Sequence, residues 1–406
     1  MSSSLEKLLA DPSIQKAWQA WKEVRRDLSR RLLLVDFSEG LATVAECKLK
    51  GDSFDLNQID VTVLPEDATD KGCPSDPAAM AELLKSVIAE RNVVAKRCAV
   101  VMPAIAFTAV PLCIDAEISI DQALTELGES GSELQLPFPR KQADIDLIDI
   151  TSPDEKKTKT HHSYMLVATQ RSNTDKIVEC CKAAGLELQL IDCGLVAPLR
   201  LFAERIKELS NDEEILHLNL SPDATSCTVV WAGGAQKMTR MAPVRTFPAI
   251  QNQEEAAEYF PVSPDDLISL VRDIKRHIKK SSNTVVEITL GGTGSAHEGI
   301  DELIGEALEI KTSVINPLDE VFLGNVNLPE GINAQVLTRI IGMGKRFLLA
   351  ERSGSVAAPA KTQISNETGE SFFGFKLDVD QKLISKRKLK TLYAPLKALM
   401  RSNIGK

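Results

Sequence analysis

The sequence predicts an α/β protein whose two lobes share one architecture and face each other across a cleft. A strand, a short turn and a second strand are indicated at 32–49, and the same pattern returns at 215–234. In both places helices and further strands follow, which is typical of α/β layers. The chain has 406 residues, of which 43% are hydrophobic. This is enough to form the hydrophobic cores of two to three domains.

The bulk composition indicates a cytoplasmic protein. The formal net charge of -9 argues against bulk attraction to nucleic acid. The eight cysteines form no CxxC pair and lie mostly in apolar runs, as expected for small buried side chains in a reducing compartment. The N-terminus is charged and amphipathic, unlike a signal peptide, and no run approaches the roughly 18 apolar residues of a membrane span. We expect a cytoplasmic protein that is at most peripheral to a membrane.

The first lobe is expected to begin with a helix and a strand–turn–strand unit. Leucines, tryptophans and a valine recur at helical spacing over 5–31. The segment RLLLVDFSEGLATVAECKLKG then predicts an apolar strand, a turn at 38–40 and a second strand. A helix near 77–91 and the buried strand CAVVMP continue the α/β pattern.

Residues 104–162 break this pattern and predict a small inserted α+β unit. It contains a helix near 119–130, the break LPFP at 136–139, an alternating strand at 143–150 and a charged tract at 152–162, expected as a hairpin tip in solvent. The first lobe then resumes, and its expected elements are the strand YMLVATQ, a helix at 173–184, the strand LELQLIDC and a helix at 195–209.

The second lobe repeats the opening unit and ends in helices. After 215–234 we expect a helix at 264–280, the strand VVEITL, the pair Gly291 and Gly292, a helix at 297–308, the strand KTSVIN and a helix at 332–350. The predicted organisation is an N-terminal amphipathic helix (1–31), a first subdomain (32–103), an inserted subdomain (104–162), the remainder of the first lobe (163–210), a second lobe (211–350), a linker (351–380) and a basic amphipathic tail (381–406).

The tail at 381–406 has a charge pattern of its own. It contains eight lysines and arginines and no acidic residue, with leucines and other apolar residues between them. This pattern fits an interfacial helix on an anionic membrane surface or a docking helix for an acidic partner. Pro395 weakens a continuous helix, and a solubilising end with no fixed structure is the competing interpretation.

The stretch EITLGGTGSAHEGIDEL, at 287–303, places two glycines where a strand ends and a helix begins. Glycine at such a junction allows the backbone to approach another group closely. That group is either a nucleotide or a neighbouring part of the same chain, and both interpretations stay open.

Several stretches together resemble the type IV pilus assembly protein PilM family, a branch of the actin-like ATPase superfamily related to FtsA and to the cytoplasmic region of GspL. They follow in the family's order, and they are VDFSEG (35–40), LPFP (136–139), AAGLELQLIDCGLVAPLRLF (183–202), LNLSPDATSCTVV (218–230), LVRDIKRHI (270–278) and LGGTGSAHEGIDELIGEALEIKTSVINP (290–317). The resemblance covers roughly residues 32–350. It implies an actin-like, ribonuclease H-like fold of duplicated α/β domains around a nucleotide cleft, with the inserted subdomain described above.

The resemblance also implies where a nucleotide would lie. The first phosphate loop corresponds to Asp36, Ser38 and Gly40, and Asp36 would be the Mg²⁺ ligand of bound ATP. The remaining implied contacts are Asn219 and Ser221 in the second phosphate loop, Asp273 and Arg276 on the helix beside the base, and Gly291, Gly292 and Gly294 on the adenosine side.

Both phosphate loops depart from the family pattern in ways that weaken an anion site. Ser38 stands in place of glycine, and Glu39 adds a negative charge where phosphate oxygens would lie. In the second loop, Pro222 removes a backbone donor and Asp223 adds another negative charge. Binding of ATP with Mg²⁺ therefore stays open, and hydrolysis is not expected.

The function that the resemblance implies is that of a cytoplasmic adaptor in the inner-membrane platform of a type IV pilus. Such a protein binds the N-terminal segment of a PilN-like inner-membrane protein and contacts other platform proteins. For this surface we expect Leu134, Leu136, Phe138 and the 143–150 strand of the inserted subdomain. The competing interpretations are an active ATPase or sugar-kinase-like enzyme of the same superfamily and a GspL-like type II secretion adaptor.

Overall fold

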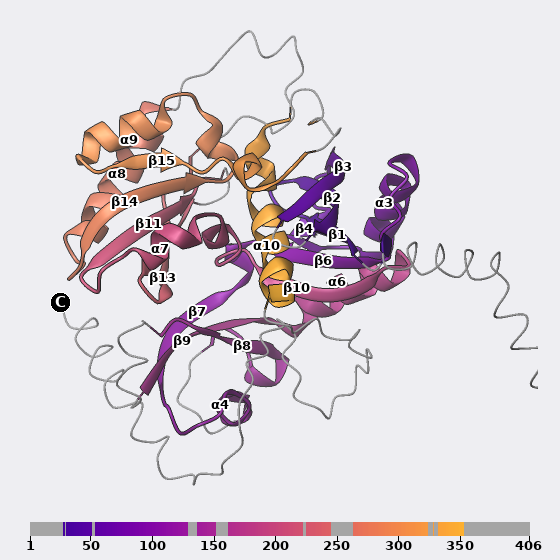
Figure 1. Ribbon diagram of the computed structural model, residues 1–406, viewed down its shortest axis with the longest axis horizontal. Coiled ribbons are helices and arrows are strands. Elements are labelled where there is room, and N and C mark those ends of the chain that lie inside the picture. Colours follow the sequence, from indigo (N-terminus) through magenta and orange to yellow (C-terminus); the bar gives the residue numbers. More distant parts are fainter. Residues whose placement is uncertain are drawn as a thin grey trace, which may run out of the picture.

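The computed structural model describes residues 27–28, 30–50, 53–128, 136–151, 161–221, 225–244, 263–323, 328 and 332–352. Within these ranges the chain forms two five-stranded sheets, a three-stranded sheet and a two-stranded one. Figure 1 shows the two large sheets side by side, with the three-stranded sheet below them and helix α10 between them. Most of the predicted N-terminal helix, the linker and the basic tail lie outside the described residues.

The first large sheet has the strand order β10-β6-β1-β2-β3. Strands β1, β2 and β3 are antiparallel neighbours, whereas β6 runs parallel to β1, and β10 runs parallel to β6. The central strand β1 is buried at five of its six positions, which explains its continuous apolar run. Its strands span Arg31–Asp36 (β1), Leu41–Lys50 (β2), Ser53–Val63 (β3), Arg97–Met102 (β6) and Glu187–Cys193 (β10).

Helices α3 (Pro77–Glu90) and α6 (Arg171–Ala183) pack against each other beside this sheet. Helix α3 begins where the sequence sets it, because the Asp76 carboxylate accepts hydrogen bonds from the amides of Ala78 (2.9 Å) and Ala79 (3.1 Å), and Pro77 occupies the first turn. The small sheet of β4 (Thr69–Asp70) and β5 (Cys73–Pro74) lies on the connection before α3.

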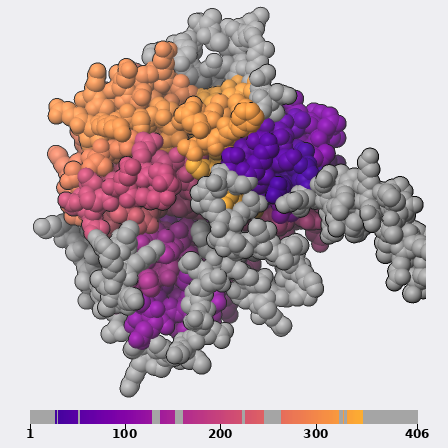
Figure 2. Space-filling model, viewed as in Figure 1, coloured from indigo at the N-terminus to yellow at the C-terminus, as the bar shows by residue number. Residues whose placement is uncertain are grey.

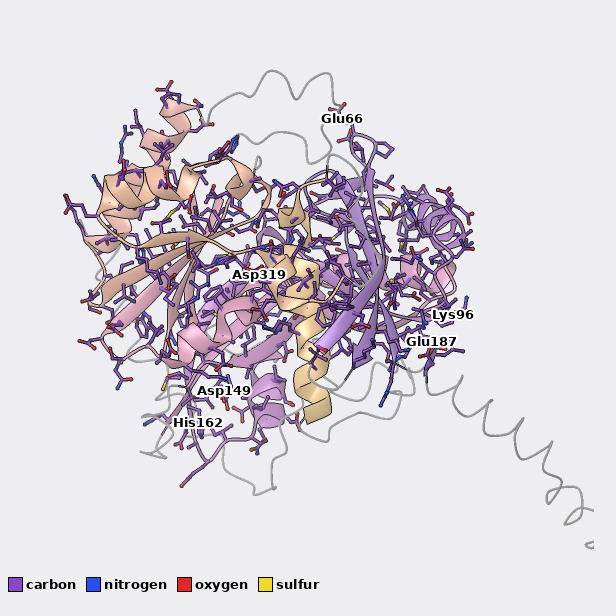
Figure 3. The ribbon with its side chains drawn as sticks, turned by 45° about the horizontal axis from the view of Figure 1, so that its top comes forward. Glu66, Lys96, Asp149, His162, Glu187 and Asp319 are labelled. Atoms are coloured by element: carbon purple, nitrogen blue, oxygen red, sulfur yellow. The ribbon has the colours of Figure 1, made fainter. Side chains whose placement is uncertain are left out.

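The inserted subdomain is an antiparallel sheet with the order β7-β9-β8, covered by helix α4. Its elements are β7 (Thr108–Asp115), α4 (Ile120–Gly128), β8 (Ala143–Asp149) and β9 (His161–Gln170). Asp149 on β8 and His162 on β9 mark one part of this sheet in Figure 3. The predicted boundary at residue 162 falls inside β9, because that strand pairs with β7 from His161 to Ala168 and with β8 up to Gln170. His161 and His162 therefore begin a strand, although the charged tract before them suggested a solvent-exposed tip.

The second large sheet repeats the topology of the first. Its order is β13-β12-β11-β14-β15, with β11, β12 and β13 antiparallel, β14 parallel to β11, and β15 parallel to β14. Helices α8 (Pro264–Ile278) and α9 (Ile300–Leu308) contribute to its separate hydrophobic core. The strands span Glu213–Asn219 (β11), Thr225–Trp231 (β12), Gly234–Met241 (β13), Thr284–Gly291 (β14) and Thr312–Val314 (β15).

The connections between the lobes are short helices and one long final helix. The predicted helix at 195–209 is instead the 3₁₀ helix η3 (Pro198–Phe202) followed by α7 (Ala203–Lys207). The predicted helix at 332–350 is the 3₁₀ helix η6 (Ala334–Leu337) followed by α10 (Thr338–Arg352). Helix α10 packs against β1, β2, β3, β6 and η3, so the C-terminal helix lies on the first lobe. In the space-filling view the yellow-orange residues near the end of the described chain lie between the orange second lobe and the indigo first lobe (Figure 2).

Candidate functional site

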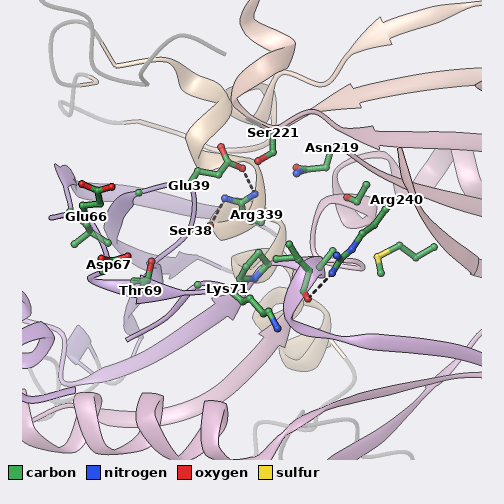
Figure 4. A pocket seen from close by; sticks show the side chains of 18 of the residues that line it. Ser38, Glu39, Glu66, Asp67, Thr69, Lys71, Asn219, Ser221, Arg240 and Arg339 are labelled. Carbon is green, nitrogen blue, oxygen red and sulfur yellow. Dashed lines mark hydrogen bonds and ion pairs between the residues drawn. The ribbon is translucent and has the colours of Figure 1, made fainter. Parts of the chain in front are cut away.

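A cavity of about 380 Å³ lies where the two large sheets face each other. The turn after β1 lines it from the first lobe, and Asn219 and Ser221, at and after the end of β11, line it from the second lobe. β1 and β11 are the central strands of their sheets, and the cavity lies at the carboxyl ends of both strands. Proteins of the α/β class commonly bind ligands at such ends. Other lining residues are Glu66, Asp67, Thr69, Lys71, Pro103, Ile105, Ser226, Met238, Arg240 and Arg339 (Figure 4).

The first loop is a tight hairpin turn. Glu39 and Gly40 both have left-handed backbone angles (φ of 60° and 70°), and the Leu41 amide donates to the Ser38 carbonyl at 3.1 Å. Two left-handed residues in a two-residue turn are typical of the turns that match the twist of paired strands. Asp36, the last residue of β1, is only 1% exposed and accepts a hydrogen bond from the Ser38 hydroxyl. Asp36, Ser38 and Gly40 therefore lie together in one turn, and a contact of this turn with a phosphate stays a prediction.

The most prominent group at this loop is Arg339, which the sequence analysis did not single out. Its Nε donates to Asp36 Oδ2 at 2.6 Å, its Nη1 to Glu39 Oε1 at 2.9 Å, and its Nη2 to the Ser38 hydroxyl. The Arg339 side chain is only 8% exposed. Burial alone lowers the pKa of Arg339, but the carboxylates of Asp36 and Glu39 outweigh it and hold the pKa above its usual value.

Glu39 also contacts the second lobe. The Thr293 hydroxyl, in the 3₁₀ helix η4 (Thr293–Ala296), donates to Glu39 Oε2 at 2.6 Å. One carboxylate thus accepts a hydrogen bond from Arg339 through one oxygen and from the second lobe through the other. The turn after β1 is consequently tied to the glycine-rich turn after β14.

That glycine-rich turn approaches the second loop of the same chain. Asn219 and Gly291 are neighbours in parallel register, and the Leu220 amide donates to the Gly291 carbonyl at 2.8 Å. The Gly294 amide donates to the Leu220 carbonyl at 3.1 Å. Gly292 has a φ of 78°, and a Cβ atom there would lie 2.5 Å from the Leu220 oxygen and 2.9 Å from Asn219 Oδ1. Of the two interpretations of the double glycine, close packing on the neighbouring strand is present, and a nucleoside contact stays a prediction.

A buried histidine lies beneath the first of these glycines. A Cβ atom at Gly291 would lie 3.2 Å from His217 Cε1, and the ring of His217 has its centroid 5.4 Å from that of Phe202. Its Nδ1 lies 3.0 Å from the Thr289 hydroxyl. Burial lowers the pKa of His217 to about 4, so the imidazole is neutral at physiological pH. The second loop is therefore supported by close packing and a neutral ring.

The predicted base-binding residues bond to each other. Asp273 and Arg276, both on α8, form an ion pair of 2.9 Å, and the Asp273 carboxylate also accepts from the Ala242 amide at 3.2 Å. Asp273 thereby fixes the residues that follow β13 to α8, a structural role that needs no ligand. A contact of either residue with a base stays a prediction.

The predicted partner-binding residues lie on the inserted subdomain. Leu136 and Phe138 are partly buried and pack against its core, next to residues of α4, β7, β8 and β9. Leu134 lies outside the described residues. Both side chains thus help to fill the subdomain's own core, and each remains partly accessible.

The residues at the first loop do not fit a Mg²⁺ ion as they are arranged. Each carboxylate oxygen of Asp36 already accepts a hydrogen bond, from Ser38 and from Arg339, and the guanidinium is a fixed positive charge at 2.6 Å. A second cation beside it would be repelled. Within the described ranges, no group of three or more histidine, cysteine, aspartate or glutamate side chains could hold a metal ion.

The duplicated sheets, the cavity between them and the final helix that returns to the first lobe agree with the predicted actin-like fold. A solved structure described as the PilM-PilN type IV pilus biogenesis complex is similar to this chain, with a TM-score of 0.62 and 16% identity over 78% of this chain and 97% of that chain. The family model described as Type IV pilus assembly protein PilM matches residues 35–233. The predicted resemblance to the PilM family is confirmed by these two matches.

More distant structures also match. The cytoplasmic domain of EpsL, an inner-membrane component of the type II secretion system of Vibrio cholerae, has a TM-score of 0.38 and 10% identity over 78% of this chain and 94% of that one. MreB5 of Spiroplasma citri bound to ADP has a TM-score of 0.40 and 9% identity over 81% of this chain and 98% of that one. A sequence search of curated proteins finds no significant match.

Proposed function

We propose that the protein is a PilM-like adaptor of a type IV pilus platform and binds the N-terminal segment of a PilN-like inner-membrane protein. The observation that carries the proposal is that the shared fold extends over 97% of the chain in the PilM-PilN complex. The described fold includes the inserted β7-β9-β8 sheet. The family match over 35–233 covers the inserted subdomain as well.

The geometry of the cleft favours a scaffold over an enzyme. Phosphoryl transfer needs a metal ion and hydrogen-bond donors that hold the phosphate groups at the two loops. In this chain the acidic groups of the first loop are bonded to Arg339 and Thr293 instead. We therefore favour the adaptor over an active ATPase or a sugar-kinase-like enzyme, and we expect no ATP hydrolysis.

The protein is proposed to work in the cytoplasm at the inner membrane. No helix in the portion that the structure describes is both long and apolar enough to cross a bilayer. Attachment would come from the membrane-anchored partner and from the basic tail at 381–406, which carries eight positive side chains. Deleting 353–406 is expected to lower co-sedimentation with vesicles containing anionic lipid, and unchanged recovery would contradict a membrane role of the tail.

The decisive experiment measures binding of the partner peptide. A synthetic N-terminal peptide of the PilN-like protein from the same genome is titrated into the full-length chain by calorimetry, with and without ATP and Mg²⁺. Phe138→Ala is expected to weaken binding about tenfold or more, because aromatic side chains in partly accessible apolar surfaces often dominate an interface.

The matched control is Phe322→Ala. Phe322 is 63% exposed, and its backbone pairs with β3 of the first large sheet, outside the inserted sheet. Circular dichroism checks that both variants are folded. Absence of peptide binding by the wild-type chain, or equal affinities of Phe138→Ala and wild type, would contradict the proposed partner surface. Binding of a GspL-type partner peptide instead would favour the secretion adaptor.

A further inference from the structure

The first loop, Arg339 and the glycine-rich turn form one buried polar cluster, which we call the cleft latch. It consists of Asp36, Ser38, Glu39, Thr293 and Arg339. The side chains of the three charged members are between 2% and 8% exposed. Charges buried to this degree are stable only when they are paired and hydrogen-bonded, and here each one is.

We propose that Arg339 is the built-in cation of this cleft: it takes the place of a metal ion beside Asp36 and, through Glu39, fastens the first lobe to the second. This contact between the lobes does not depend on the partner proposed above.

The shape of the guanidinium matches this role. Its Nε and its two terminal nitrogens each donate to a different residue of the turn, Asp36, Glu39 and Ser38. A planar fork with fixed donor directions can satisfy three acceptors at once, which the single ammonium group of lysine does less well. Figure 4 shows the Arg339 side chain entering the turn from α10, with the bonds to Glu39 and Ser38 drawn.

The position of α10 makes Arg339 a rigid group. A Cβ atom at Gly342 would collide with the Ala197 carbonyl, so the helix lies directly on the backbone before η3. Arg200 donates to the Gly342 carbonyl at 3.2 Å and also pairs with the buried Asp192. Arg346, one turn further along α10, reaches the same Asp192 at 3.3 Å. These contacts fix the helix independently of the cleft.

The latch crosses between lobes through a single carboxylate. Arg339 lies on a helix that packs on the first sheet, whereas Thr293 follows β14 of the second sheet. Glu39 accepts from both. The two lobes are consequently joined at the place where a bound metal–nucleotide would otherwise join them, and binding such a ligand would require breaking this cluster.

The test compares the wild-type chain with Arg339→Met and with Lys345→Met. Lys345 is on the same helix and pairs with Glu320, so its loss removes a similar side chain and a different ion pair. Uptake of Mn²⁺ is followed by electron paramagnetic resonance. We expect saturable Mn²⁺ binding only in Arg339→Met, where Asp36 and Glu39 are left without their cation, and its loss again when Asp36→Asn is added.

Hydrogen exchange supplies a second readout of the same variants. The amides of Leu41 and Gly294, which bond to Ser38 and Leu220, report the two turns. Their exchange is expected to be at least about tenfold faster in Arg339→Met than in the wild type or in Lys345→Met. If Arg339→Met does not fold, the neutral triple variant Asp36→Asn, Glu39→Gln, Arg339→Met is measured, with fast exchange at both turns expected.

Each other outcome would overturn the proposal. Mn²⁺ binding by the wild type as tight as by Arg339→Met would show that Arg339 does not occupy the cation position. A folded Arg339→Met variant without Mn²⁺ uptake would show the same. If the amides of both turns exchange in Arg339→Met, or in the triple variant, at the same rates as in the wild type, the cluster does not hold the lobes together.

Discussion

The turn after β1 and the turn after β11 occupy equivalent positions in the two lobes, yet different interactions hold them in place. The first is held by charge, because Arg339 bonds to Asp36, Ser38 and Glu39. The second is held by close backbone packing, because Gly292 lies directly on Leu220 and Asn219. Two loops at equivalent positions of a duplicated architecture can therefore be held by unrelated interactions, and each should respond to a different kind of perturbation.

The largest effect is expected from removing the charge at the first turn. Arg339→Met leaves two buried carboxylates without their cation, although each keeps one hydrogen bond from a hydroxyl, and this should lower the free energy of unfolding by about 3–5 kcal/mol. The more exposed ion pair of Lys345 is expected to contribute at most about 1 kcal/mol when Lys345→Met removes it. Urea unfolding of the three proteins measures both values, and equal losses would contradict a special role of the first turn.

The second turn should be most sensitive to added volume. Gly292→Ala places a Cβ atom against the Leu220 carbonyl at a left-handed backbone position, so we expect a loss of about 3 kcal/mol. Gly185→Ala is the control, since Gly185 has a φ of 74° but open space around its Cβ position. That variant should lose only the roughly 1–2 kcal/mol of backbone strain. A similar loss at both sites would mean that packing adds nothing at Gly292.

Acid should weaken the second lobe through His217. Burial lowers the pKa of His217 to about 4, whereas the unfolded chain has a value near 6.5. Between these two pH values the unfolded state binds the extra proton, so stability falls as the pH is lowered from 6.5 toward 4, by up to about 3 kcal/mol. His217→Gln removes this contribution. Unfolding free energies at several pH values should therefore show a shallower slope for His217→Gln, and parallel slopes would contradict the prediction.

The smallest effect is expected from Glu39→Gln, which tests the contact between the two turns. The amide keeps an acceptor for Thr293 or for Arg339 but loses the charge, and we expect a loss of about 1–2 kcal/mol. Thr293→Val removes the hydroxyl donor on the other side. A double-mutant cycle of the two changes, followed by thermal unfolding, should give a coupling energy of about 1 kcal/mol. Strict additivity of the two losses would show that the contact between Glu39 and Thr293 contributes no coupling energy.

Much of the fold follows from local patterns. The continuous apolar run of β1, the two-residue turn at Glu39 and Gly40, and the capping of α3 by Asp76 are all determined by neighbouring residues. The extent of β9 was missed, because His161 and His162 follow a charged tract and gain their strand structure only by pairing with β7. The helix expected at 195–209 was also too long, because this segment joins the lobes and packs on α10.

The candidate site was predicted only in part. Asp36, Ser38 and Gly40 lie together because they are close in the sequence, and their contact with a nucleotide stays a prediction. Gly292 was correctly expected to make a close approach, but its neighbour is the Leu220 carbonyl. Arg339 carried no local signal, because nothing near it in the sequence distinguishes it from other arginines at a helix start.

By itself, then, the sequence determined the two strand–turn–strand units and the family resemblance, because strand alternation, turn residues and glycine junctions depend on residues close together in the chain. Only the tertiary structure decided what fills the cleft. Arg339 and Asp36 are 303 positions apart and meet because α10 returns from the second sheet to lie on the first. Pairing of buried charges is set by distance in space, and that distance is known only once both lobes are folded.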